Sequence, residues 1–354
     1  MGNQSYAYAM GRIRAVERTM LGRAQFDRMI EAKTADDALR VLSEAGYGAG
    51  GDTGGSGGLV GASGSVGAPG SSGSPDVASD YERLLDEENG KLIAFILEVS
   101  PARGLLGVFL RRYDYHNIKA LLKAEFSGLA GDPPLSGMGL VSPEKLALIL
   151  RERSFSQLTP AMAAGAEDAI LAYGKSQDPQ AIDVRLDHAM YAEMLADAAA
   201  LENPFLVRLV RIYIDLANIT AFLRMRAMKK GSDFLRETLI PGGEVDRGLF
   251  YRHFSDGLET FIAAMLYTPY GQVCEEGLKN YQSTGRLTAF ERGADDYVNG
   301  YIKAARLRPV GAEVIVCYFV ARQAELKNVR IVMVGKKNGI SGDVIRERLR
   351  ETYV

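Results

Sequence analysis

The 354-residue sequence has no tryptophan, two cysteines and three histidines. Cys274 and Cys317 lie in different segments without the spacing of a metal-binding or redox motif, so we expect two buried free thiols in a reducing compartment. The longest apolar run, Val314–Val320, is far shorter than the roughly 20 residues that cross a bilayer. These shortages argue against zinc-stabilised, disulfide-stabilised and membrane-spanning proteins.

An excess of charge is also missing, because 42 Lys and Arg residues stand against 44 Asp and Glu residues and give a formal net charge of -2. A globally basic nucleic-acid-binding protein is therefore excluded, and any charged partner must meet a local patch. Residues 1–10 lack a basic stretch followed by an apolar segment, so we expect no signal peptide and a protein on the cytosolic side.

What the sequence does contain is helical periodicity. Between residues 6 and 45, apolar residues at helical spacing predict two helices separated at Gly22 and then a third, which Thr34 and Asp37 would start as a capping box. The pattern resumes after residue 80 and continues to the end, interrupted by prolines. Residues 329–334 are the best strand candidate, but they lie in a longer apolar pattern that favours a helix. The predicted fold class is all-α.

Residues 48–75 differ from the rest, since glycine and serine dominate and charge is nearly absent. Such a composition cannot bury enough surface to offset its ordering entropy, which predicts a flexible insertion. The segment lacks the Gly-Lys-Ser/Thr ending of a phosphate-binding loop and follows a helical pattern instead of a strand. We therefore expect no nucleotide site there.

An internal repeat organises the chain. An acidic residue, two variable residues, Asn and then Ile or Val occur three times, at Asp114–Ile118, Asp215–Ile219 and Glu325–Val329. An acid and an Asn three positions apart lie on one helical face, and buried polar groups must be satisfied. The recurrence in all copies favours a structural contact between helices over a ligand site.

Candidate helix starts precede each copy of the repeat. They have the form of capping boxes and lie at Thr34–Asp37, Ser154–Gln157 and Asp256–Glu259. With the repeat, they predict three helical units over residues 1–128, 129–230 and 231–354, the first interrupted by the insertion at 48–75.

Basic residues surround each copy of the repeat. They are Arg103, Arg111, Arg112, Lys119 and Lys123; Arg208, Arg211, Arg224, Arg226, Lys229 and Lys230; and Arg322, Lys327, Arg330, Lys336 and Lys337. Solvated helix faces account for part of this pattern. The rest suggests three related basic faces toward an acidic partner or an anionic membrane surface.

Catalytic patterns are not found. His116, His188 and His253 each stand alone, without a second ligand at helical or strand spacing. There is no nucleophile elbow, and residues 335–339 (Gly-Lys-Lys-Asn-Gly) are typical of a helix end, not a phosphate loop. We expect no catalytic, cofactor-binding or metal-binding residues.

Three ordered segments carry a family resemblance: residues 6–17 (YAYAMGRIRAVE), 114–119 (DYHNIK) and 325–339 (ELKNVRIVMVGKKNG). Together they resemble the C-subunit family of V/A-type ATP synthases (V-type ATPases), which is related to the d subunit of eukaryotic V-ATPases. The resemblance implies a funnel-like, all-helical protein of three similar units in pseudo-threefold array. The Gly/Ser-rich insertion departs from the family pattern.

In that family the protein sits on the membrane rotor ring and receives the foot of the central stalk, which links ATP turnover to proton or sodium transport. The resemblance therefore implies a non-catalytic coupling subunit without cofactors, at the cytoplasmic face of the membrane and attached to it through the complex only. Its implied partners are central-stalk subunits and the ring proteolipid, with no role for nucleic acid.

Two alternatives belong to other classes. One is a helical repeat scaffold that binds unrelated proteins, although units of about 100 residues exceed the roughly 20 to 50 residues of most solenoid repeats. The other is an unrecognised helical hydrolase or transferase, which clustered His, Asp or Cys residues would have supported.

Overall fold

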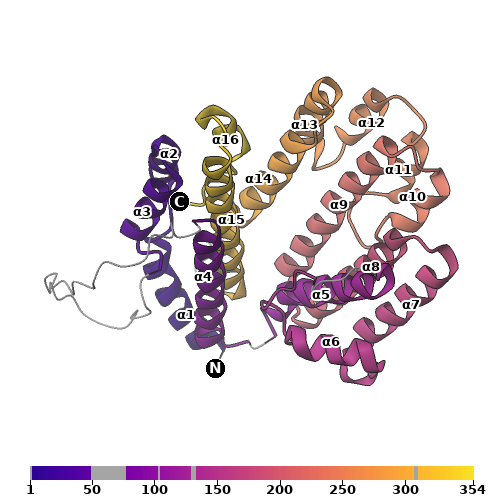
Figure 1. Cartoon of the computed structure of the whole chain (residues 1–354), viewed down its shortest axis with the longest axis horizontal. Helices are drawn as coiled ribbons and strands as arrows, with labels where there is room; N and C mark the ends of the chain where they lie inside the picture. The colour runs from indigo at the N-terminus through magenta and orange to yellow at the C-terminus, as the bar shows by residue number, and fades with distance from the viewer. Residues whose placement is uncertain (1, 49–76, 103, 129–132, 307–309) are drawn as a thin grey trace, which may run out of the picture. The chain divides into compact units, whose positions relative to one another are not determined.

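The computed structural model describes residues 2–48, 77–102, 104–128, 133–306 and 310–354. Within these ranges the chain forms sixteen α-helices and one short 3₁₀ helix, and no strand occurs among them (Figure 1). The predicted all-α class is confirmed. The predicted insertion at 48–75, apart from Gly48, and the basic residue Arg103 lie outside the described residues.

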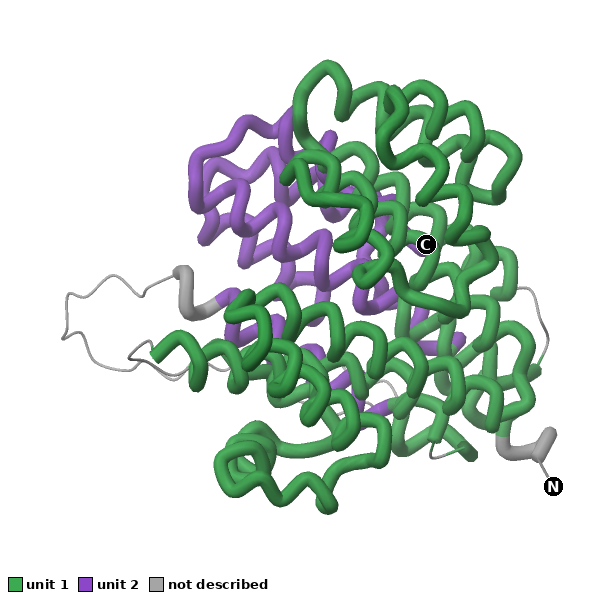
Figure 2. The backbone as a smooth tube through the Cα atoms, turned by 90° about the vertical axis from the view of Figure 1, so that its right-hand side faces the viewer, with its two compact units in different colours: residues 1–13, 96–320 green, residues 14–95, 321–354 purple. Residues whose placement is uncertain are grey.

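The helices fall into two units, which Figure 2 colours separately. Unit 1 comprises Met1–Ile13 and Ile96–Val320, and unit 2 comprises Arg14–Phe95 and Ala321–Val354. The helices wholly in unit 1 are α5 (Gly107–Ser127), α6 (Pro143–Glu152), η1 (Phe155–Gln157), α7 (Pro160–Ser176), α8 (Pro179–Ala200), α9 (Pro204–Ala227), α10 (Ser232–Thr238), α11 (Arg247–His253), α12 (Leu258–Met265), α13 (Gly271–Thr284) and α14 (Thr288–Ala305).

The helices wholly in unit 2 are α2 (Arg23–Glu31), α3 (Ala35–Glu44) and α16 (Gly342–Arg348). Three longer helices contribute residues to both units, namely α1 (Gly2–Glu17), α4 (Val77–Val99) and α15 (Ala312–Lys337). The division at residues 128 and 230, which follows from the sequence repeat, stays a prediction.

Proline and a polar cap together start four of the helices in unit 1. The first residues of these helices are Pro143, Pro160, Pro179 and Pro204, and the caps before them are Ser142, Thr159, Asp178 and Asn203. Proline suits this position because the first helical N–H has no partner in the helix, and each cap side chain accepts a hydrogen bond from another of the free N–H groups.

At the first of the three predicted capping boxes the Thr34 cap is confirmed, since the Thr34 side chain accepts from the backbone N–H of Asp37 at 3.1 Å. The carboxylate of Asp37 accepts from the Thr34 hydroxyl at 2.8 Å and not from the backbone N–H of Thr34, so the reciprocal half of the box is absent from the described contacts. The other two are wrong. Ser154 precedes a single 3₁₀ turn and makes no capping hydrogen bond. Helix α12 starts after Gly257, and Asp256 instead contacts His253 with its carboxylate, at 3.1 Å.

Residues 329–334 lie inside the long helix α15, so the helical prediction for this segment is confirmed. The helix stop is also confirmed: Gly339 adopts a left-handed φ of 64°, and the N–H of Ile340 donates to the carbonyl of Gly335 at 2.9 Å. This arrangement satisfies a carbonyl that the helix itself leaves unpaired. Among the described helices, none combines the length and apolar character that crossing a bilayer requires.

Each copy of the repeat lies on a helix that contributes to its own apolar core. Residues of α5 pack with α6, α7 and α8 around Tyr115, Ile118 and Leu122. On α9, Phe222 contacts the rings of Phe250, Phe254 and Phe261 from α11, α12 and the segment between them. In unit 2, α15 packs with α2, α3, α4 and α16, as in Figure 1. These cores hold the three acid–Asn motifs away from water.

Candidate functional site

The three acid–Asn motifs form buried pairs, which we number along the chain. Every one of the six side chains is at most 4% exposed. Pair one is Asp114 and Asn117 on α5, pair two is Asp215 and Asn218 on α9, and pair three is Glu325 and Asn328 on α15. Because buried polar groups are costly unless bonded, their partners determine what the pairs do.

The Asn of each pair makes two reciprocal hydrogen bonds with one residue farther along the chain. Its amide group donates to that residue's carbonyl, and its amide oxygen accepts from the same residue's N–H. The partners and distances are Ser136 for Asn117 (2.8 and 2.8 Å), Ile240 for Asn218 (2.8 and 2.8 Å) and Arg350 for Asn328 (3.1 and 2.9 Å). The Asn side chain therefore supplies hydrogen-bond partners to a residue that lies outside the helices.

In pairs one and two, the acid bonds the same segment that the Asn of its own pair bonds. Asp215 accepts from the N–H groups of Glu244 at 2.9 Å and Val245 at 3.1 Å, and the Tyr270 hydroxyl donates to it at 2.9 Å. In pair one, the equivalent donors to Asp114 are the N–H groups of Leu140 at 3.1 Å and Val141 at 3.0 Å. Each acid thus fixes the chain just before the next helix, α11 or α6.

A glycine makes this close approach possible in both pairs. A Cβ atom on Gly139 would lie 2.1 Å from Oδ1 of Asp114, and one on Gly243 would lie 2.0 Å from Oδ1 of Asp215. Any side chain at these positions would displace the carboxylate. These glycines were not predicted from the sequence, although the shared Gly-x-Val of 139–141 and 243–245 would have revealed them.

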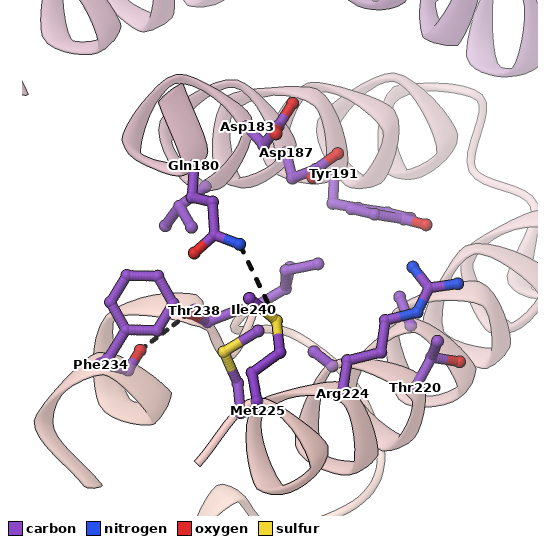
Figure 3. A pocket seen from close by; sticks show the side chains of 14 residues that line it. Gln180, Asp183, Asp187, Tyr191, Thr220, Arg224, Met225, Phe234, Thr238 and Ile240 are labelled. Carbon is purple, nitrogen blue, oxygen red and sulfur yellow. Dashed lines mark hydrogen bonds between the residues drawn. The ribbon is translucent and has the colours of Figure 1, made fainter. Parts of the chain in front are cut away.

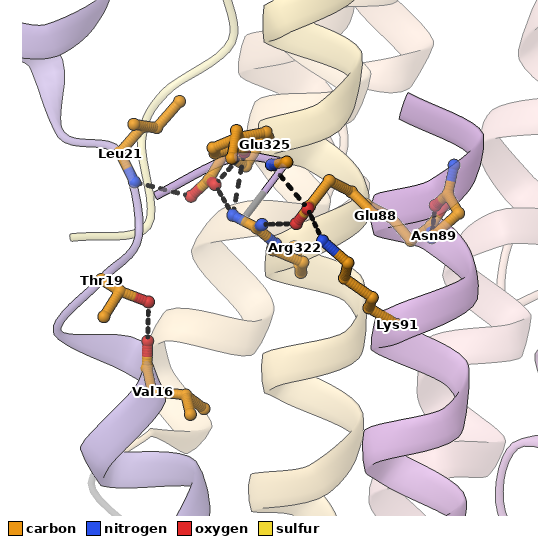
Figure 4. Close-up of polar contacts among 11 residues, drawn as sticks. Val16, Thr19, Leu21, Glu88, Asn89, Lys91, Arg322 and Glu325 are labelled. Carbon is orange, nitrogen blue, oxygen red and sulfur yellow. Dashed lines mark hydrogen bonds and ion pairs between the residues drawn. The ribbon is translucent and has the colours of Figure 1, made fainter. Parts of the chain in front are cut away.

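Pair three has a different arrangement, shown in Figure 4. Glu325 accepts from the N–H of Leu21 at 2.8 Å and from the hydroxyl of Tyr47 at 2.5 Å, and it also pairs with Arg322. Arg322 bonds in turn to Glu88 on α4 at 2.8 Å. The last helix of the repeat is thus bonded to the segment that enters α2, 304 residues earlier.

Burial raises the pKa of all three acids, since removal from water disfavours the charged form. The backbone N–H donors oppose this shift at Asp114 and Asp215, and Arg322 opposes it most at Glu325. Each of the three acids accepts a hydrogen bond from at least one backbone N–H, so the predicted structural role of the repeat is confirmed.

Most of the recurring basic residues make contacts within the chain, and the expectation of three related basic faces toward a partner stays a prediction. Ion pairs within the described ranges include Arg111–Glu193, Lys119–Asp187, Lys123–Asp183, Arg208–Glu244, Arg224–Glu291, Lys230–Asp178, Arg322–Glu88 and Arg330–Glu82. The side chains of Arg208, Arg224 and Arg330 stay at least half exposed in these pairs.

Two further basic residues cap helix ends. Arg226 donates to the carbonyls of His253 at 3.0 Å and Phe254 at 2.5 Å, at the end of α11, and Lys336 donates to the carbonyl of Ala32 at 2.6 Å, after the end of α2. Cations are favourable there because the last carbonyls of a helix are unpaired and carry partial negative charge.

A pocket of about 420 Å³ lies between α8, α9 and α10 (Figure 3). Its apolar lining includes Met225, Met228 and Phe234. The amide oxygen of Gln180 is buried in this pocket without a hydrogen-bond partner in the described part of the chain. Tyr191 lies at one end of the pocket, near Arg224 in the view of Figure 3.

Comparison with known proteins identifies the family. The model of the ATP synthase (C/AC39) subunit family matches residues 70–348, which is most of the chain and contains all three pairs.

The chain belongs to this family.

Three relatives have informative names. The C subunit of the V-type sodium ATPase from Enterococcus hirae is 25% identical over 274 residues, covering 77% of this chain and 83% of the relative. The C subunit of the A-type ATP synthase from Methanocaldococcus jannaschii is 24% identical and covers 97% and 86%. The corresponding protein of Pyrococcus horikoshii is 22% identical and covers 92% and 85%.

Residues with catalytic potential are dispersed in this member of the C/AC39 family. His116 is exposed, His188 contacts the carbonyl of Thr238 at 3.3 Å, and His253 contacts Asp256. Burial lowers the pKa of His188. Cys274 and Cys317 are buried, as predicted. Within the described ranges, no group of three His, Cys, Asp or Glu side chains could hold a metal ion.

Proposed function

We propose that the chain is the non-catalytic coupling subunit of a rotary V/A-type ATPase or ATP synthase. In this role it links the central stalk to the membrane rotor ring, so that ATP synthesis or hydrolysis is coupled to proton or sodium transport. The observation that carries the proposal is the family match over residues 70–348, together with relatives named as subunits of a sodium ATPase and of ATP synthases.

The three pairs support a mechanical role. Transmitting torque requires segments that keep their positions under load, and buried hydrogen-bond networks provide such rigidity when every group is satisfied. Pair two alone fixes the backbone at Ile240, Glu244 and Val245 with four hydrogen bonds. The pairs act on packed backbone segments, which agrees with a mechanical role.

The pairs also support the three-unit division at residues 128 and 230. Pair one bonds residues 136–141, which open the second predicted unit, and pair two bonds residues 240–245 in the third. Pair three bonds Leu21, in the first. Each pair thus bonds residues of two different predicted units to one another.

The proposed partners are the central-stalk subunits and the ring proteolipid, with the chain attached to the cytoplasmic face of the membrane through the complex. An affinity pulldown from detergent-solubilised host membranes, with this chain as bait, tests the proposal. Recovery of the ring proteolipid together with central-stalk subunits is the expected result. Recovery of soluble proteins alone would favour the helical scaffold instead.

A further inference from the structure

One basic side chain of unit 1 differs from its neighbours. On α5, Arg111, Lys119 and Lys123 all have carboxylate partners, at 3.1 Å or less. Arg112 has none within ion-pair distance in the part of the chain that the structure describes. Its guanidinium stacks 4.8 Å from the ring centre of Tyr113 and donates to that hydroxyl at 2.8 Å. A guanidinium has five N–H donors, so most of its capacity is unused.

Two more tyrosines approach the same guanidinium. Helix α8 packs against both α5 and α9, and it carries Tyr191, while α9 carries Tyr213. Both phenols interact electrostatically with Arg112, and neither hydroxyl forms a hydrogen bond within the described ranges. All three residues keep part of their surface exposed.

These tyrosines are donors at neutral pH. Burial raises the pKa of Tyr191, and it raises that of Tyr213 to about 12, so each hydroxyl keeps its proton. The carboxylate of Asp187, which interacts electrostatically with Tyr191, is paired with Lys119 at 2.5 Å. The site therefore presents one unpaired cation and two hydroxyl donors to whatever occupies it.

We propose that Arg112, Tyr191 and Tyr213 bind a carboxylate of a partner protein. The inference rests on the proposed coupling function and assigns the carboxylate to an acidic residue of the central stalk. A planar guanidinium fork matches a carboxylate in geometry and in charge. Arg and Tyr are also the residue types that most often dominate protein–protein binding energy. A single cation matches the single charge of a carboxylate better than the higher charge of a phosphate.

The neighbouring pocket indicates what else the partner segment carries. Tyr191 belongs both to the Arg112 site and to the pocket between α8 and α9, whose lining includes Met225, Met228 and Phe234. Methionine-rich linings adapt to varied apolar side chains. An amphipathic stalk helix with an apolar residue beside an acidic one would occupy both places, and a donor on it would satisfy the free amide oxygen of Gln180.

The test is a binding titration of the full chain against the purified central-stalk subcomplex, with Arg112→Gln, Tyr191→Phe and Tyr213→Phe. Arg112→Gln should weaken binding about 30-fold and reduce its salt dependence, because a charge-assisted contact is lost. Each Phe variant should weaken binding about 3- to 5-fold through loss of one donor. The matched control is Arg151→Gln, at an exposed arginine on α6 that makes no ion pair within the described ranges, which should change nothing.

The outcomes separate this inference from the proposed function. If the wild-type chain binds the stalk and Arg112→Gln binds equally well, the carboxylate site is overturned while the coupling function stands. If the wild-type chain does not bind the stalk, both fail. A titration with inorganic phosphate is added to the experiment. Tight phosphate binding that depends on Arg112 would contradict the proposal that the site binds a protein carboxylate. If Arg112→Gln does not fold, the two Phe variants, which remove one oxygen each, test the site instead. Unchanged binding of the stalk by both Phe variants would contradict the proposal.

Discussion

In pairs one and two of unit 1 an Asp accepts hydrogen bonds from distant backbone N–H groups, whereas in pair three of unit 2 a Glu does so. Asp215 reaches the N–H groups of a segment about 30 residues ahead, and a glycine lets that segment come close. Glu325 reaches the N–H of Leu21, which belongs to the other end of the chain. The longer Glu325 side chain is held there by an ion pair with Arg322 and a hydrogen bond from Tyr47. Of these two kinds of contact, the described part of the Asp-based pairs shares only the tyrosine hydrogen bond, from Tyr270 to Asp215.

The difference shows how one motif adapts to chain connectivity. Where the acid bonds a segment that follows directly, a short side chain and a glycine are sufficient. In pair three the entry to α2 takes the place of a following segment, and an ion-pair network holds it. The cost is a buried cluster of charges, in which Glu325 is 4% and Glu88 7% exposed. Such clusters are stable only when every partner is present.

The largest expected effect comes from breaking that cluster with Arg322→Met. Removal of the guanidinium leaves the carboxylates of Glu325 and Glu88 buried without it, which should cost about 3–5 kcal/mol of unfolding free energy. The matched control is Arg330→Met on the same helix, whose ion pair with Glu82 is 50% and 43% exposed and should contribute less than about 1 kcal/mol. Urea unfolding followed by circular dichroism measures both, and equal losses would contradict the buried-cluster account.

Next in size is Asn218→Ala in pair two. The N–H and carbonyl of Ile240 would lose their partner in a buried position, and we expect a loss of about 2–3 kcal/mol. Asn117→Ala should cost less, because the hydrogen bonds of Asn117 to Ser136 are partly exposed and water can replace the side chain. The comparison of urea midpoints tests this order, and a larger loss for Asn117→Ala would show that burial does not rank the pairs.

Gly243→Ala tests the close approach of chain to carboxylate. The added Cβ would lie 2.0 Å from Oδ1 of Asp215, so the segment must shift, at a cost of about 1–3 kcal/mol. Gly300→Ala on α14 is the control, since nothing lies within 4 Å of its added Cβ and alanine favours helices. Thermal unfolding of the two variants should change in opposite directions. A stabilising effect of Gly243→Ala would mean that the glycine is not required.

The smallest effect concerns pH. Burial raises the pKa of Asp215 above its value of about 3.9 in an unfolded chain. The folded state therefore keeps a proton that the unfolded state has lost, and the contribution of Asp215 is fully present below the unfolded pKa and decreases as pH rises through the folded pKa. Asp215→Asn should make the fall of unfolding free energy with rising pH shallower in this window. An unchanged or steeper fall would contradict the direction of the shift.

Local sequence rules predicted the features that depend on neighbouring residues. The Thr34 cap, the stop at Gly339 and the helix through 329–334 all follow from side chains within one or two turns. The structural role of the acid–Asn motif was also predicted, because the motif recurs three times in the amino-acid sequence. Its bonding partners, such as Ile240 or Leu21, were not, since they are set by packing.

The errors arose where a second contact competes with a local rule. Asp256 could cap a helix, but its carboxylate bonds to His253 and its carbonyl accepts from Arg226 at 2.7 Å. The basic residues gave the same lesson, because Arg226 and Lys336 stand eight residues after the Asn of their motif and both cap a helix end. At that position after Asn117 stands Glu125, which instead pairs with Arg153. Charge counts alone could not reveal these roles.

The most direct test of the account is ion transport by the complete complex in liposomes, with and without this chain. Coupling predicts that removal of the chain leaves ATP hydrolysis by the catalytic head but abolishes ATP-driven ion transport, and that adding the purified chain back restores transport. Transport at an unchanged rate in the absence of the chain would contradict the coupling function.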